Sequence, residues 1–132
     1  MDKGAHFYKC DFQVHTPRDL NWSGENATTA DERKVYAEEL IRSCREKGIG
    51  ALAITDHHDF VFFPYIKKAA ESEQDTYGNK IESERKIIVF PGLELTLATP
   101  PCQALLILDT NFPENLLHGV LTTLAITPYT KW

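Results

Sequence analysis

The sequence predicts an α/β fold in which strands and helices follow one another in the order β-α-β-α-β-β-α. Two observations support this prediction. Short apolar runs bounded by glycine, proline or polar residues, as in buried strands, alternate with longer segments whose apolar residues recur at helical spacing. Such alternation implies right-handed crossovers and a largely parallel sheet or part of a barrel. The chain of 132 residues can bury a core and is expected to form a single domain over residues 1–132.

The composition excludes some classes of protein. The hydrophobic fraction of 42% and the charged fraction of 25% are ordinary for a globular domain, and the formal charge of −5 argues against a general nucleic-acid binder. Cys10, Cys44 and Cys102 are odd in number and widely spaced, and the first residues show no secretory signal, which predicts free thiols in a cytoplasmic protein. Prolines interrupt the most apolar region, Ile87–Leu108, so no membrane span is predicted.

The first predicted strand covers Phe7–Thr16, where polar and apolar residues alternate. Gln13 and His15 belong to its polar face and should lie side by side at the carboxyl end, whereas the other face holds Tyr8, Cys10, Phe12 and Val14. A histidine at such a position is either a hydrogen-bonded strand-end residue or a ligand. The loop Thr16–Gly24 follows, and its Arg18 is either a phosphate clamp or a solvated arginine.

A helix and a second strand come next. Thr29 and Glu32 have the spacing of a capping box, and Gly48 stands where a helix-terminating glycine is common. The helix has an apolar stripe at Ala37, Leu40, Ile41 and Cys44, which makes Cys44 a core residue rather than a reactive thiol. The apolar run Gly48–Ile54 then predicts a buried strand.

Four ionisable side chains follow this second strand, in Thr55-Asp56-His57-His58-Asp59. In α/β proteins the carboxyl ends of strands are where ligands and catalytic groups gather. Two imidazoles and two carboxylates are suitable ligands for zinc, manganese or iron. The alternative is a charged loop that faces solvent.

The second half of the chain supplies a further acidic residue. Phe60–Phe63 is predicted to be core, a helix is expected from Pro64 to about Glu73, and a third strand from Ile87 to Phe90 should end at Pro91-Gly92. Glu94 lies between leucines, and a buried glutamate requires either a metal ion or a basic partner.

A fourth strand and a last helix complete the prediction. The strand covers Cys102–Leu108, and the helix opens at Asn111 and Pro113. Its apolar stripe consists of Leu117, Val120, Leu121 and Leu124, and His118 beside the stripe is expected at the surface.

Three motifs in this chain resemble those of the polymerase-and-histidinol-phosphatase (PHP) family. The family opens with Asp-x-His-x-His-Thr, matched by Asp11–Thr16, continues with Thr-Asp-His, matched by Thr55–His57, and then shows Pro-Gly-x-Glu, matched by Pro91–Glu94. The motifs occur in the family's order and span most of the chain. The segment Thr16–Asp19 and Trp22 look most like the TrlF-type subgroup, in which the domain precedes an ATPase portion.

The resemblance implies a fold, a chemistry and a site. The family fold is a distorted (β/α)7 barrel with a site for two or three metal ions, used for phosphoester hydrolysis. By resemblance, His15, His57 and Glu94 would be metal ligands, and Asp56 a ligand or a residue that orients one. Asp56, His57 and Arg18 would serve catalysis on a phosphorylated small molecule or a nucleic-acid end, through water activated by divalent ions such as zinc, manganese or iron.

This chain also departs from the family pattern. Gln13 replaces the first histidine of the opening motif, Gln103 stands where a later histidine is common, and the closing motifs have no counterpart. We therefore expect the N-terminal part of a PHP-like domain, a partial barrel of the kind that further sequence, an ATPase portion or a partner chain would complete. The alternative to a phosphoesterase or nuclease is a degenerate domain that acts as a binding or regulatory module.

Overall fold

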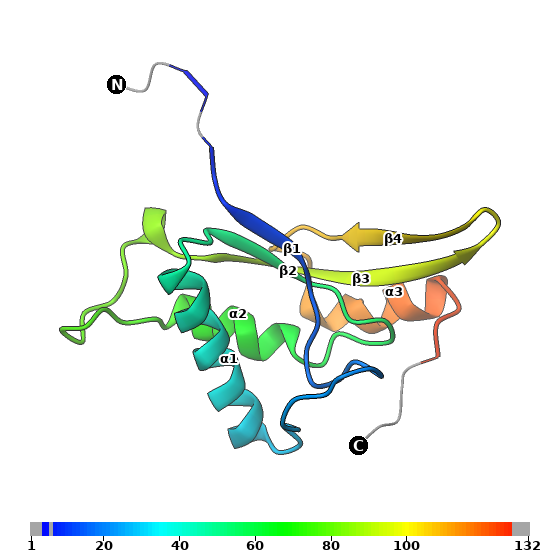
Figure 1. The fold of residues 1–132 in the computed structure, drawn as a ribbon, viewed down its shortest axis with the longest axis horizontal. Helices are drawn as coiled ribbons and strands as arrows, with labels where there is room; N and C mark the ends of the chain where they lie inside the picture. Colours follow the sequence, from blue (N-terminus) through cyan, green and yellow to red (C-terminus); the bar gives the residue numbers. More distant parts are fainter. Residues whose placement is uncertain (1–3, 6, 128–132) are drawn as a thin grey trace.

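The structure is a computed structural model that describes residues 4–5 and 7–127 (Figure 1). Its helices and strands follow the predicted order, with two short 3-10 helices in addition. The elements are β1 (Cys10–Val14), α1 (Ala30–Glu46), β2 (Ala51–Ile54), α2 (Phe63–Glu71), η1 (Ser83–Arg85), β3 (Ile88–Ala98), β4 (Pro101–Ile107), η2 (Glu114–Leu116) and α3 (Leu117–Thr123).

The four strands form one curled sheet, a half-barrel, in the order β1-β2-β3-β4. β1, β2 and β3 are parallel, and β4 pairs antiparallel with β3. All three helices lie on the same side of this sheet (Figure 1). The protein is therefore a mixed α/β protein, as the sequence predicts, while the complete PHP-type barrel stays a prediction.

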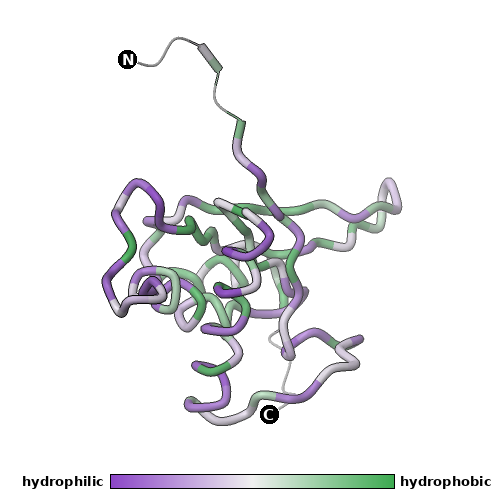
Figure 2. Tube along the Cα trace, turned by 60° about the vertical axis from the view of Figure 1, so that its left-hand side comes forward, coloured by the Kyte–Doolittle hydropathy of each residue, from purple (hydrophilic) through white to green (hydrophobic). Residues whose placement is uncertain are grey.

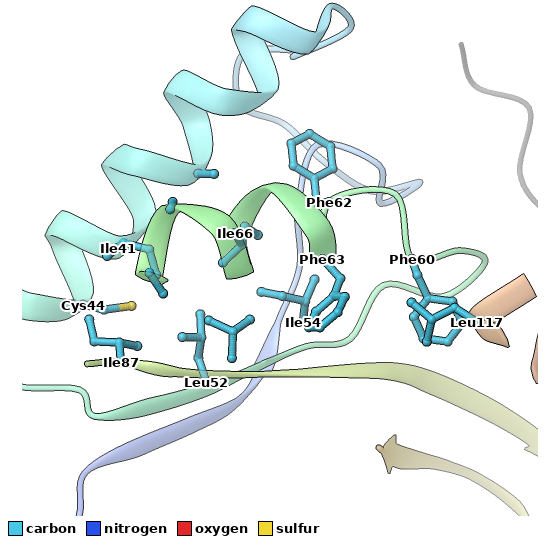
Figure 3. Packing of buried hydrophobic residues seen from close by; sticks show 14 of the residues in the cluster. Ile41, Cys44, Leu52, Ile54, Phe60, Phe62, Phe63, Ile66, Ile87 and Leu117 are labelled. Carbon is cyan, nitrogen blue, oxygen red and sulfur yellow. The ribbon is translucent and has the colours of Figure 1, made fainter. Parts of the chain in front are cut away.

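The hydrophobic core lies between the sheet and the helices (Figure 3). Ile41 from α1 and Ile66 from α2 pack toward Leu52 of β2, and Phe62 and Phe63 are fully buried. Burial of a side chain of this size stabilises the fold by roughly 1.5–3 kcal/mol. The prediction that Phe60–Phe63 belongs to the core is confirmed for Phe60, Phe62 and Phe63.

Helix α1 forms as its sequence predicts. The Thr29 hydroxyl accepts a hydrogen bond from the Glu32 backbone N–H at 3.1 Å, which satisfies one of the free donors at the helix start. The predicted stripe faces the core, with Ala37, Ile41 and Cys44 buried. Burial raises the pKa of the Cys44 thiol, in keeping with an inert core residue, and the three cysteines are unpaired.

Strand β1 departs from the predicted alternation at a register shift. Cys10 lies opposite Ala51, but Val14 lies opposite Ile54, with an irregularity between Asp11 and Val14. Ala51 and Ile54 are three residues apart and so point to opposite faces of the sheet. Tyr8, Cys10 and Phe12 are exposed, and of the predicted apolar face Val14 alone packs against the core. The prediction of one continuous apolar face is therefore wrong.

Strand β3 does not end at Pro91-Gly92, as the sequence predicted, but continues to Ala98. The strand changes partner at this point, because Pro91 is the last residue paired with β2 and Gly92 is the first paired with β4. A proline is tolerated at this change of partner, since its missing N–H removes no ladder hydrogen bond there. A Cβ on Gly92 would meet the Leu106 carbonyl oxygen at 2.6 Å, so only glycine allows this close approach of the strands.

The sheet face opposite the helices carries apolar side chains. Phe12 contacts Phe90 edge to face at 5.9 Å, and Phe12, Ile88 and Leu105 are 40%, 47% and 41% exposed. In Figure 2 the strands are mostly hydrophobic, whereas the loop between α2 and β3 is mostly hydrophilic. The described part of the chain thus covers only one face of the sheet with helices.

The last helix is confirmed with two corrections. It does not open at Asn111 and Pro113, because the 3-10 helix η2 covers Glu114–Leu116 and α3 begins at Leu117. Leu117 and Leu121 are buried, Val120 is partly buried and His118 is exposed, as predicted. Leu124 is 40% exposed, because α3 ends at Thr123 and Leu124 lies beyond its last turn. No helix within residues 4–5 and 7–127 has the length and apolar character to cross a membrane.

Candidate metal centre

Three segments meet beyond the carboxyl end of β2. The backbone N–H of Thr55 donates to the carbonyl of Val14 at 2.8 Å, and the N–H of Glu94 donates to the carbonyl of Asp56 at 3.2 Å. These bonds continue the sheet past the end of β2. They bring the loop after β1, the loop after β2 and the middle of β3 together, although residues from these segments lie about 40 positions apart.

His15 and His57 lie at the centre of this junction. Their rings are stacked, with centroids 5.3 Å apart and an angle of 6° between the planes. The Nε2 atoms of His15 and His57 face the Glu94 Oε2 atom at 3.2 and 2.9 Å. Glu94 is 4% exposed, so its carboxylate is buried against two imidazoles, as the sequence required of a buried glutamate.

Gln13 also reaches Glu94. Its Nε2 atom donates a hydrogen bond to the Glu94 Oε1 atom at 2.7 Å. Phe12 contacts Phe90, which shares a face of β3 with Glu94. Strict alternation would place Gln13 on the face opposite Phe12, away from Glu94, so the register shift in β1 accounts for the contact. The structure therefore brings Gln13, His15, His57 and Glu94 together, although Glu94 lies within β3 rather than after its end.

Two groups of ligand atoms in this cluster could hold a metal ion. One consists of His15, His57 and Glu94, and the other of His15, Asp19 and Asp56; in each group the atoms lie within 4.8 Å of one another. A neutral imidazole has one lone pair, so His15 can bind an ion on one side only. The first group has two imidazoles and one carboxylate, a donor set that suits zinc and leaves a coordination position open. The residues present therefore fit a divalent ion.

Asp19 is the residue of this cluster that the sequence did not reveal. Its Oδ2 atom lies 2.9 Å from the Nδ1 atom of His15 and 2.9 Å from the Nδ1 atom of His57. Burial raises the pKa of Asp19, but the backbone N–H of Asn21 and the two histidines lower it by more, and the net shift is downward. In the sequence Asp19 is marked only by its spacing of four from His15 and by its place in the segment Thr16–Asp19 that resembles the TrlF-type subgroup, and neither assigns it a role.

Asp56 is buried, and both of its oxygens contact Thr16. They accept hydrogen bonds from the Thr16 backbone N–H at 2.8 Å and from the Thr16 hydroxyl at 2.6 Å. Burial raises the pKa of Asp56 to about 6 despite these bonds, and the charge of Asp59 adds to the rise. The Asp56 Oδ1 atom is 4.0 Å from the His15 Nδ1 atom, so Asp56 lies behind the histidines rather than beside Glu94. Its role as a ligand or catalytic residue stays a prediction, and these contacts favour orientation of the loop.

Arg18 is not a solvated loop arginine, since it is only 7% exposed. Its Nη2 and Nε atoms bind the Asp59 Oδ2 atom at 2.6 and 3.0 Å, which neutralises a buried carboxylate. The structure thus joins the loops after β1 and β2 through this ion pair. A role for Arg18 toward a substrate phosphate stays a prediction, and such a role would require the guanidinium to leave Asp59 or to bind both groups.

A pocket opens beside the cluster. It has a volume of about 490 Å³ and lies between the ends of β2 and α3 and the second half of β3. His57, His58 and Glu94 form its polar wall, and the remaining wall is mostly apolar, with Leu95, Leu97, Leu124, Ala125 and Ile126. The Nε2 side of the candidate metal centre is therefore accessible to a small molecule.

Comparison with known proteins adds no relative to this picture. No family model, curated protein or solved structure matches the chain.

Proposed function

We propose that this protein binds a divalent metal ion through His15, His57 and Glu94 and hydrolyses a phosphoester at that ion. One observation supports the proposal above all others. Two imidazole nitrogens and a buried carboxylate oxygen, from segments far apart in the sequence, converge within 4.8 Å at one edge of a pocket. The resemblance of the three motifs to the PHP family supports the choice of reaction.

The residues have distinct roles in this proposal. An ion bound there would lower the pKa of a bound water and withdraw charge from the phosphoryl oxygens. His15 and His57 present neutral nitrogens, and Glu94 supplies the negative charge that makes a divalent ion favourable at a buried site. His58 lines the same pocket, where its ring would be a candidate partner for the leaving oxygen.

The substrate in this proposal is a phosphorylated small molecule or the end of a nucleic acid. The overall charge of −5 disfavours a long stretch of nucleic acid, because it would repel the phosphates outside the pocket. Zinc, manganese and iron all suit the donor set of two imidazoles and a carboxylate.

The test is the metal content and metal affinity of the purified chain and of two variants. The wild type should hold about one equivalent of zinc or manganese. His57→Ala removes a ligand atom and Glu94→Gln removes the negative charge of a ligand, so each should weaken binding by about 100-fold or more. A phosphatase assay with a chromogenic phosphomonoester should lose its turnover in the same variants.

Glu73→Gln is the matched control. Glu73 is a partly buried glutamate whose oxygens bind Arg45 rather than a histidine, so this variant should keep the metal. If the wild type binds no metal at millimolar manganese, the proposal is wrong.

A specific observation favours a second function, that of a binding or regulatory module within a larger assembly. Gln13 stands at the position of a family histidine and uses its amide on Glu94, and the sheet face opposite the helices exposes Phe12, Ile88 and Leu105. A partner chain or an ATPase portion that covered this face would bury apolar surface. Metal binding without turnover of any phosphoester, together with a stable complex with such a partner, would support this second function.

A further inference from the structure

The two stacked histidines lie between two carboxylates. The Glu94 Oε2 atom faces both Nε2 atoms, and the Asp19 Oδ2 atom faces both Nδ1 atoms on the other side. The sequence singles out Glu94 by its apolar surroundings, but nothing in the sequence assigns a role to Asp19.

The chemistry of imidazole makes the two carboxylates unequal. A neutral imidazole carries one proton and one lone pair, and an ionised carboxylate can only accept a hydrogen bond. Both His57 nitrogens lie 2.9 Å from a carboxylate oxygen, but the contact between Nδ1 and Asp19 has hydrogen-bond geometry, whereas the contact between Nε2 and Glu94 is an ion-pair distance without it. The proton therefore belongs on Nδ1. The lone pair then points from Nε2 toward Glu94 and the pocket, where a metal ion can use it.

The Nδ1 atom of His15 also favours the proton over Nε2, but less strongly than that of His57. The His15 Nδ1 atom also lies 2.9 Å from the Asp19 oxygen, yet this buried nitrogen has no hydrogen-bond partner within the described residues. Stacked parallel rings explain the difference, because one oxygen cannot lie in both ring planes. The negative charge of Asp19 still favours a proton on the Nδ1 atom of His15.

We propose that Asp19 is a positioning residue of the metal centre, which holds His57, and to a lesser degree His15, with Nε2 free to bind the ion. The effect on metal affinity rests on the function proposed above, whereas the effect on the His57 proton does not. Carboxylates that hold ligating histidines in this way contribute about 10- to 100-fold to metal affinity.

The surroundings of Asp19 fit this role. The residue is 5% exposed, its Oδ1 atom accepts a hydrogen bond from the Asn21 N–H at 2.8 Å, and its own N–H donates to the Thr16 carbonyl at 2.8 Å. Thr16 in turn is bound to Asp56. The carboxylate is thus held on a loop that is fixed to the loop after β2, which makes its second oxygen a defined acceptor.

The test compares the wild type with Asp19→Asn. The amide oxygen can still accept the Asn21 hydrogen bond, so the turn is kept while the charge is lost. Zinc affinity, measured by competition with a chelator, should fall about 10- to 100-fold. Asp75→Asn is the matched control, because Asp75 accepts hydrogen bonds from the N–H groups of Tyr77 and Asn79 in an exposed turn. The zinc affinity of this variant should equal that of the wild type.

A second measurement needs no variant and no metal. Long-range ¹H–¹⁵N spectra of the metal-free wild type at pH 9 report which nitrogen of His57 carries a proton, and Nδ1 should be protonated. An unprotonated Nδ1 of His57, or an unchanged zinc affinity in Asp19→Asn, overturns the proposal. If the wild type itself binds no zinc, the proposed function fails and the proton on His57 alone decides whether Asp19 positions that ring.

Discussion

Two pairs of buried acids lie at the same end of the sheet and have different partners. Asp56 and Asp59 bind Thr16 and Arg18 from the loop after β1. Asp19 and Glu94 face the nitrogens of two histidines. All four are at least 93% buried, so burial does not separate them.

At this end of the sheet, the partner of a buried acid, rather than its burial, indicates its role. A carboxylate that already holds a guanidinium or several hydrogen-bond donors is satisfied without an ion and joins two loops. A carboxylate whose partners are imidazoles shares them with any metal ion that binds. We therefore propose that Asp56 and Asp59 contribute mainly to stability and that Asp19 and Glu94 belong to the candidate metal centre, and three changes test this division.

The largest expected effect comes from Arg18→Met. Removal of the guanidinium leaves Asp59 buried and unpaired, and loss of one partner of a buried ion pair destabilises a protein by about 3–5 kcal/mol. Denaturant unfolding should show this loss. Arg45→Met is the control, since the pair between Arg45 and Glu73 is partly exposed and should contribute about 1 kcal/mol or less. Unchanged stability with lost phosphatase turnover would instead support a phosphate-binding role for Arg18.

A smaller effect concerns Asp56 and pH. Its pKa in the folded chain is about 6, above the ordinary value of 3.8, so the folded state binds the proton more tightly than the unfolded state does. The free energy of unfolding should therefore fall as the pH rises from about 4 to 6, by on the order of 3 kcal/mol from this group. Asp56→Asn should remove that part of the slope in the metal-free protein. If the free energy of unfolding depends on pH in the same way in the wild type and in Asp56→Asn, the pKa of Asp56 is not raised by folding.

The smallest expected effect is an increase in zinc affinity from Gln13→His. The Gln13 amide already touches Glu94, so an imidazole at this position would add a ligand to the metal centre and raise zinc affinity by about tenfold. Gln103→His is the matched control, because Gln103 on β4 is exposed and pairs with Thr96 of β3 rather than with Glu94. An equal gain from both substitutions would mean that Gln13 has no special place in the cluster.

Much of the fold follows from local patterns in the sequence. The capping box, the stripe of α1 and the order of the elements could all be predicted, because spacing along a helix or strand fixes which residues share a face. The register shift in β1 and the continuation of β3 through Pro91-Gly92 could not be predicted, since both depend on how residues of neighbouring strands pair. His15, His57 and Glu94 were predictable because each follows or occupies a recognisable strand. Asp19 was not, because only the folded loop brings it to His57.

Gly92 leaves little room for change beside the candidate metal centre. The residue lies two positions before Glu94, at a point where the Leu106 carbonyl and the Thr55 side chain leave no room for a Cβ. A larger residue would push β3 away from β2 or β4, and Glu94 would move with it. Metal ligands are held within about 0.2 Å of their ideal distances. A single methyl group at position 92, with no contact to an ion of its own, would therefore be enough to displace Glu94 from the other ligands of the candidate centre.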